Sequence, residues 1–114
     1  MRKIYLMQVT AEQNWSASDL TEDKAEAAAG FLKVLAHRER LAILCALVDG
    51  ERAVSELEFM LELRQTTVSQ HLARLRLEGF VCARRTGKQI FYSISDPRAL
   101  EVMKTLHGLF CADK

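Results

Sequence analysis

The chain contains 114 residues, of which 49% are hydrophobic and 27% are charged. This length and mixture predict one globular domain and exclude a disordered or low-complexity chain. Every apolar run is shorter than the ~20 residues of a membrane span. The N-terminal stretch Ile4–Met7 is too short for a secretory signal. We therefore expect a cytoplasmic protein without a membrane segment.

The net charge of +1 hides an uneven distribution along the chain. Residues 19–62 contain five basic and ten acidic side chains, whereas residues 63–92 contain six basic side chains and one acidic side chain. This asymmetry indicates a surface that faces an anion, with a solvated basic face as the alternative.

The first half of the chain predicts three helices. Thr21 precedes two acidic residues, which is typical of a helix start, and this helix runs to about residue 36. A second helix is predicted over 39–48. One of its faces carries Leu41, Leu44, Cys45 and Val48. Ser55 and Glu58 have the spacing of a capping box at the start of a third helix.

The second half predicts a fourth helix, a hairpin and a closing helix. The fourth helix spans about 66–78, with a buried stripe of Val68, Leu72 and Leu75 at helical spacing. Two β-prone runs, 81–85 and 89–94, flank Gly87 and indicate a hairpin. Asp96 and Pro97 are typical of an N-cap and first position, and this last helix continues to about Cys111.

Together these elements predict a mainly α fold with a β-hairpin wing, a winged helix–turn–helix in the order α-α-α-α-β-β-α. Residues 1–20 show little periodicity, so we expect an N-terminal arm, mobile or forming a short helix, before a domain that spans 21–114. The first and last helices carry more apolar surface than one small core needs. A homodimer is therefore expected.

The face of the fourth helix opposite the buried stripe is suited to a DNA groove, because its side chains are small or polar. On the helix, the candidate DNA contacts are Thr66, Thr67, Ser69, Gln70, His71 and Arg74, and on the hairpin they are Arg84, Arg85 and Lys88. His71 flanks the stripe, so a packed or capping role remains open beside a base contact.

Five segments of the chain resemble the ArsR family of repressors. They are Val68–Arg76, Gly79–Val81, Arg84–Lys88, Phe91–Tyr92 and the upstream Leu35–Leu41. The resemblance covers about residues 22–111. It implies a homodimeric winged-helix repressor whose first and last helices form the interface and which a bound effector releases from double-stranded operator DNA.

The metal sites familiar in this family are incomplete here. Ala53 and Ser55 stand where the thiolates of the third-helix site would be. In the last-helix site, Asp96 is followed by Arg98 in place of a histidine, and Phe110 replaces the ligand after His107. Two of four ligands hold a tetrahedral zinc poorly, so we expect neither a metal site nor any other cofactor.

The positions of Cys45 and Cys111 resemble the paired cysteines of the persulfide-sensing branch of the family. That resemblance implies that reactive sulfur species are the effector and join the two thiols through a disulfide or polysulfide bridge. Cys82 matches no sensing position. Two buried cysteines that serve only packing are the plainer alternative, because cysteine is among the most buried residue types.

Two further alternatives remain: a general oxidant sensor, and a metal-responsive repressor with a non-standard site of Cys45, His107 and Cys111. An enzyme is not expected. The three cysteines include no Cys-x-x-Cys pair, and the five glycines are isolated rather than grouped in a phosphate-binding loop.

Overall fold

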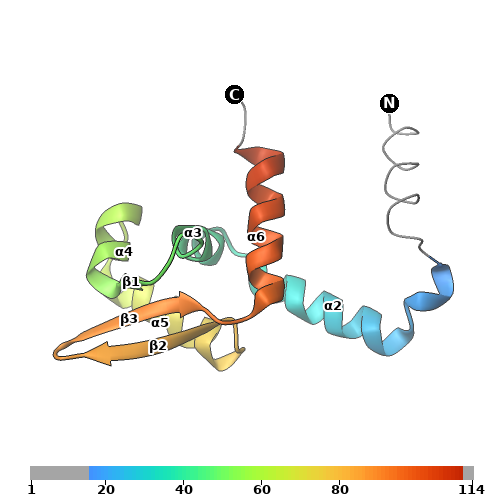
Figure 1. The fold of residues 1–114 in the computed structure, drawn as a ribbon, viewed down its shortest axis with the longest axis horizontal. Coiled ribbons are helices and arrows are strands. Elements are labelled where there is room, and N and C mark those ends of the chain that lie inside the picture. The colour runs from blue at the N-terminus through green and yellow to red at the C-terminus, as the bar shows by residue number, and fades with distance from the viewer. Residues whose placement is uncertain (1–15, 112–114) are drawn as a thin grey trace. The chain divides into compact units, whose positions relative to one another are not determined.

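A computed structural model describes residues 16–111 of the chain (Figure 1). Its elements are the 3-10 helix η1 (Ala17–Asp19), α2 (Glu22–Leu35), α3 (Arg38–Ala46), β1 (Arg52–Ala53), α4 (Val54–Leu61), α5 (Gln65–Leu77), β2 (Val81–Thr86), β3 (Gln89–Ile94) and α6 (Pro97–Phe110). The predicted winged helix–turn–helix is confirmed, with every predicted helix and both hairpin strands in the predicted order.

The chain divides into two compact units, residues 1–32 and 33–114. In the first unit the described residues form η1 and most of α2, and the side chain of Asp19 accepts a hydrogen bond from the backbone of Ser16 at 3.2 Å. Of the arm expected over 1–20, residues 1–15 lie outside the described residues. All the elements from α3 onward belong to the second unit.

The core of the second unit is built around α5. The predicted stripe of Val68, Leu72 and Leu75 is fully buried, as are Leu57 of α4 and Leu44 of α3. The three side chains of α5 repeat at helical spacing, so this helix turns one apolar face inward. Helices α3, α4 and α5 therefore form one packed layer against which the hairpin and α6 lie.

The wing contains one more strand than the sequence pattern indicated. β2 and β3 pair in antiparallel register from Val81 with Ile94 to Thr86 with Gln89, and β1 pairs with the other edge of β3. The turn at Gly87 has φ of 61°, which a glycine adopts without strain. The predicted two-stranded hairpin is thus corrected to a three-stranded sheet, because a two-residue strand such as β1 has no periodicity to recognise.

The start of α4 also differs from the prediction. The helix begins at Val54, directly after β1, and the side chain of Glu56 accepts a hydrogen bond from the backbone of Ala53 at 2.8 Å. The predicted capping box of Ser55 and Glu58 is therefore wrong, because strand pairing fixes Ala53 as the last extended residue.

The last helix begins as predicted. Asp96 is its N-cap and accepts from the backbone N–H of Arg98 at 2.9 Å, while Pro97 occupies the first turn. The Arg98 guanidinium also pairs with the Asp96 carboxylate at 2.8 Å. Within residues 16–111, no helix is both long and apolar enough to cross a bilayer.

Replacing Asp96 with Ala is expected to lower the free energy of unfolding by about 1 kcal/mol at neutral pH, since an N-cap is lost. Hydrogen bonds from Arg98 hold the pKa of Asp96 below its ordinary value of 3.8. The carboxylate therefore stabilises the fold above about pH 4 and loses this effect as the pH falls through the lowered pKa.

Urea unfolding between pH 7 and pH 2 checks this prediction. The stability curves of the parent and of Asp96→Ala should converge in acid. Asp96→Asn, which keeps an acceptor oxygen but no charge, should lie between them at neutral pH. Parallel curves over the whole range would contradict the role assigned to the carboxylate.

Candidate functional site

The exposed face of α5 carries the polar residues predicted from the sequence. Burial of Val68, Leu72 and Leu75 turns Thr66, Gln70 and Arg74 to the surface. Thr67 and Ser69 are half-buried at the margin of this face. The side chains of Ser69 and Arg74 each have a partner four residues away in the chain. Gln65 donates to the Ser69 hydroxyl at 3.3 Å, and Arg74 pairs with Glu78 at 3.1 Å.

His71 is turned toward the start of α3. Its Nε2 lies 3.0 Å from a carboxylate oxygen of Glu39, and its ring centroid lies 4.5 Å from that of His37. The side chain of His71 is only 15% exposed. Of the two roles left open by the sequence, this placement favours a packed histidine.

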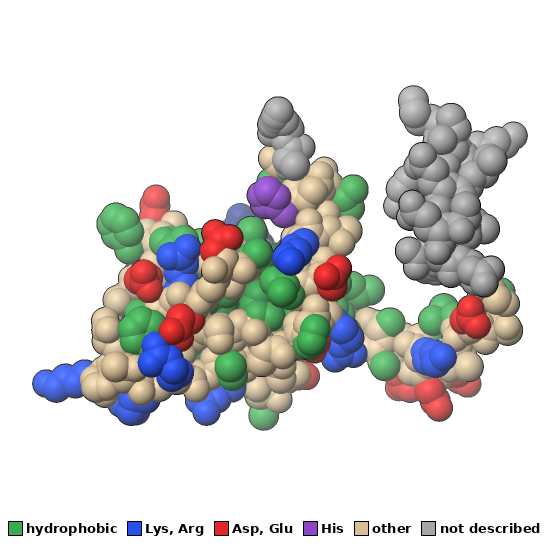
Figure 2. Space-filling model, in the orientation of Figure 1, with side chains coloured by type: hydrophobic (Ala, Val, Ile, Leu, Met, Phe, Trp, Pro, Cys, Tyr) green, Lys and Arg blue, Asp and Glu red, His purple; other side chains and the backbone are tan. Residues whose placement is uncertain are grey.

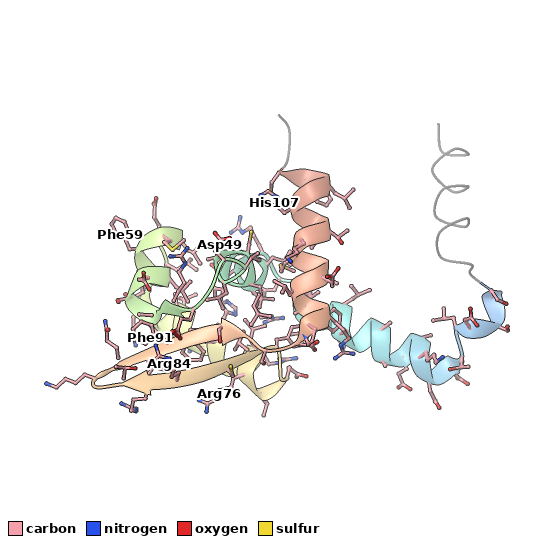
Figure 3. The ribbon with its side chains drawn as sticks, in the orientation of Figure 1. Asp49, Phe59, Arg76, Arg84, Phe91 and His107 are labelled. Carbon is pink, nitrogen blue, oxygen red and sulfur yellow. The ribbon has the colours of Figure 1, made fainter. Side chains whose placement is uncertain are left out.

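The hairpin carries three basic side chains in two different situations. Arg84 forms two hydrogen bonds with Glu51, at 3.0 and 2.7 Å, and its guanidinium lies 5.0 Å from the ring centre of Phe91 (Figure 3). These hydrogen bonds hold the pKa of Glu51 below its ordinary value. Arg85 and Lys88 are exposed and form no ion pair within the part of the chain that the structure describes.

Lys and Arg side chains gather around the hairpin, at the lower left of Figure 2. Arg84 is paired with Glu51, so Arg85 and Lys88 are the hairpin cations that remain available to bind an anion. With the exposed Thr66, Gln70 and Arg74 of α5 they make up the candidate nucleic-acid interface, in which Arg74 pairs with Glu78. Glu51 was not singled out from the sequence, and no local signal indicates it, because it lies 33 residues from Arg84.

Helix α3 carries two apolar stripes rather than one. Ile43, Leu44 and Leu47 are buried in the core. Leu41 and Cys45 lie on the neighbouring side of the helix, where Leu41 is half-buried and Cys45 is exposed. The sequence placed Cys45 on one apolar face with Leu44. In the structure Leu44 is buried and Cys45 is exposed, because the helix is rotated so that Ile43 turns inward with Leu44.

An apolar groove of about 600 Å³ lies between α3 and α6, and both Cys45 and Cys111 line it. Cys111 follows directly on the last turn of α6. Apart from the two cysteines, the lining residues are Ala36, His37, Arg38, Leu41, Ala42, Met103, Leu106, His107 and Phe110. Figure 2 shows hydrophobic side chains exposed at the base of α6, and His107 is labelled near its other end in Figure 3.

All three cysteines are free and exposed. Packing in the core of the chain therefore does not account for Cys45 or Cys111. Cys82 lies away from the groove on β2, where its sulfur is 3.4 Å from the hydroxyl of Ser93 on the neighbouring strand. The structure thus brings the two predicted sensing cysteines to one groove and leaves the third elsewhere.

Asp96, the first residue of the last-helix metal pattern, pairs with Arg98, which stands where that pattern has a histidine. Among residues 16–111, one group brings three ligand atoms within 4.8 Å of one another, and it consists of His37, Glu39 and His71. The alternative trio of Cys45, His107 and Cys111 is not gathered in this way.

Comparison with known proteins agrees with this fold. The family described as "Bacterial regulatory protein, arsR family" matches residues 37–82. The "Biofilm growth-associated repressor" of Agrobacterium fabrum is 45% identical over 91 residues, which cover 80% of this chain and 78% of that protein.

Two solved structures are also similar. The repressor BigR from Xylella fastidiosa superposes with a TM-score of 0.80 at 40% identity, covering 87% of this chain and 100% of that one. Reduced HlyU from Vibrio cholerae superposes with a TM-score of 0.77 at 41% identity, covering 80% of this chain and 96% of that one. The resemblance to the branch that contains BigR is thereby confirmed.

Proposed function

The chain belongs to the ArsR family of bacterial regulatory proteins, and we propose that it is a homodimeric repressor controlled by the thiols of Cys45 and Cys111. In this proposal the reduced protein binds double-stranded operator DNA. Reactive sulfur species bridge the two cysteines and release it. The Agrobacterium fabrum protein and BigR are named as repressors, whereas HlyU of Vibrio cholerae is named as a transcriptional activator.

The observation that carries this proposal is the shared groove. Cys45 comes from α3 and Cys111 from the end of α6, and both free thiols line one apolar space. An exposed thiol is open to reagents, whereas a buried one is inert. One of the similar structures is named as HlyU in its reduced form.

A persulfide oxidises such a pair without any other oxidant. The thiolate of one cysteine takes the outer sulfur atom of the persulfide, and the remaining thiol leaves. The second thiolate then displaces that sulfur as hydrogen sulfide and closes a disulfide. A disulfide requires Cα atoms within about 7 Å, whereas a bridge that retains extra sulfur atoms spans a wider gap.

Bridging the pair links α3 to α6. Helix α3 packs on α5, which presents Gln70 and Arg74, so a shift of α3 is transmitted to the proposed reading surface. A hundredfold loss of operator affinity corresponds to about 2.7 kcal/mol of coupling. Strain in a poorly placed bridge reaches several kcal/mol, which is sufficient.

The proposed dimer uses apolar surface that the chain leaves uncovered. Leu109 and Phe110 of α6 are 68% and 80% exposed, and Leu32 of α2 is 56% exposed. Neighbouring exposed apolar side chains such as Leu109 and Phe110 are typical of an interface. Two symmetric copies would also place two α5 helices in successive major grooves about 34 Å apart.

We expect a dimer in sedimentation experiments at micromolar concentration in reducing buffer. Phe110→Glu should shift this equilibrium toward the monomer, because it places a charge in the apolar interface. Phe59→Glu is the matched control, since Phe59 of α4 is 86% exposed and lies outside the proposed interface. A parent protein that sediments as a monomer would refute the dimer.

Replacement of Gln70 with Ala is expected to change the base preference of the protein, at a cost of about 1–3 kcal/mol in binding to the preferred sequence.

Replacement of Arg85 with Ala should weaken binding to all DNA sequences alike. It should also reduce the salt dependence of the affinity by the equivalent of about one phosphate contact. Fluorescence anisotropy with operator and scrambled duplexes over a salt series separates the two effects. Lys104→Ala, which removes an equal charge from α6, should change neither.

The switch is expected to require both thiols that line the groove. Under a persulfide donor, Cys45→Ser and Cys111→Ser should stay bound to operator DNA, while Cys82→Ser should release it like the parent. Intact mass should show the loss of two hydrogen atoms within one chain, alone for a disulfide or together with the gain of sulfur atoms for a polysulfide bridge. A Cys111→Ser protein that still releases DNA contradicts the two-thiol mechanism.

Parallel treatments distinguish the alternatives. Release by peroxide at the same concentrations as persulfide indicates a general oxidant sensor. Release by zinc that requires Cys45 and Cys111 indicates a metal-responsive repressor. Release by persulfide alone is the outcome expected here.

A further inference from the structure

Three side chains meet where the start of α3 lies against α5. His37 is the N-cap of α3, Glu39 lies in its first turn, and His71 lies midway along α5. Their ligand atoms all lie within 4.8 Å of one another, and Nε2 of His71 is 3.0 Å from Oε1 of Glu39. Among the described residues, no other three side chains of these types meet in this way.

We propose that His37, Glu39 and His71 bind a divalent transition metal ion of the zinc type. Two imidazoles and a carboxylate are ligands that zinc accepts, and three protein ligands leave a fourth position for water. This proposal is independent of the dithiol switch, since it uses neither Cys45 nor Cys111.

The distances require only a small adjustment. Metal–ligand bonds of 2.0–2.1 Å in a tetrahedral site place ligand atoms about 3.3 Å apart. The pair of His71 and Glu39 already has this spacing, and both side chains are partly buried, at 15% and 30% exposure. His37 is exposed, so it can rotate inward by the remaining distance.

Metal binding exchanges one interaction of His37 for another. Nδ1 of His37 accepts a hydrogen bond from the backbone N–H of Glu39 at 3.2 Å, so the neutral ring carries its proton on Nε2. Coordination through Nε2 moves that proton to Nδ1, and coordination through Nδ1 uses the lone pair directly. In either case the hydrogen bond from the backbone N–H of Glu39 to Nδ1 of His37 is lost, and this loss can be measured.

Metal binding also replaces the hydrogen bond between Nε2 of His71 and Oε1 of Glu39, because both atoms become ligands.

Zinc titration of the full, tag-free chain tests the proposal. The three cysteines are first replaced by serine, because thiolates bind zinc themselves. Competition with a chromophoric chelator should then give one zinc per chain. His37→Ala, His71→Ala and Glu39→Gln should each weaken binding at least tenfold.

The chain offers a matched control in its third histidine. His107→Ala removes an imidazole from α6 and should leave zinc affinity unchanged. Cobalt should replace zinc and give the visible absorption of a tetrahedral site in the parent and in His107→Ala. Equal loss of binding in His107→Ala, or no binding by the thiol-free chain, overturns the proposal.

A measurement without substitution at the site guards against variants that fail to fold. In NMR spectra of the thiol-free chain, zinc should move the backbone amide signal of Glu39, because its hydrogen bond to His37 is broken. If zinc binds while that signal and the His37 and His71 ring signals stay in place, the metal lies elsewhere and the proposal fails.

Discussion

The burial of one stripe of α5 is the constraint on which the other features depend. Val68, Leu72 and Leu75 are fully buried, and each large aliphatic side chain contributes about 1.5–3 kcal/mol when it leaves water. Their burial fixes the rotation of α5 about its axis. Because that rotation is fixed, the side chains of Gln70 and Arg74 lie on the solvent-exposed side of the helix. The position of the candidate DNA-reading surface is thus a consequence of packing on its opposite side.

Helix α3 joins the two regions in which chemistry is proposed. Its core stripe packs on the same layer as α5, and its second stripe presents Cys45 to the groove beside α6. Its N-terminal end holds Glu39 against His71. This helix has only nine residues and packs directly on α5, so a change in structure at either of its ends also affects its packing on α5. The wing is anchored separately, through the pairing of β1 with β3 and of Glu51 with Arg84.

Features with a local cause were predictable from the sequence. The helical repeat of Val68, Leu72 and Leu75, the capping pair of Asp96 and Pro97, and the glycine turn of the hairpin each depend on residues within one or two turns of chain. Local backbone and side-chain geometry is enough to define them. The order of the elements and the family were also predictable, as was the exposure of Gln70, Arg74, Arg85 and Lys88. Thr67, Ser69 and His71, which were predicted on the same surface, are partly buried.

The sequence by itself therefore determined the elements, their order and the outward face of α5, while the tertiary structure decided how the elements meet. Periodicity identifies apolar positions on α3 but not which of two adjacent stripes lies deeper, so the exposure of Cys45 was missed. The strand β1 and the start of α4 depend on pairing with β3, far along the chain. The contacts of Glu51 with Arg84 and of Glu39 with His71 join residues more than thirty positions apart, and only folding places such residues together.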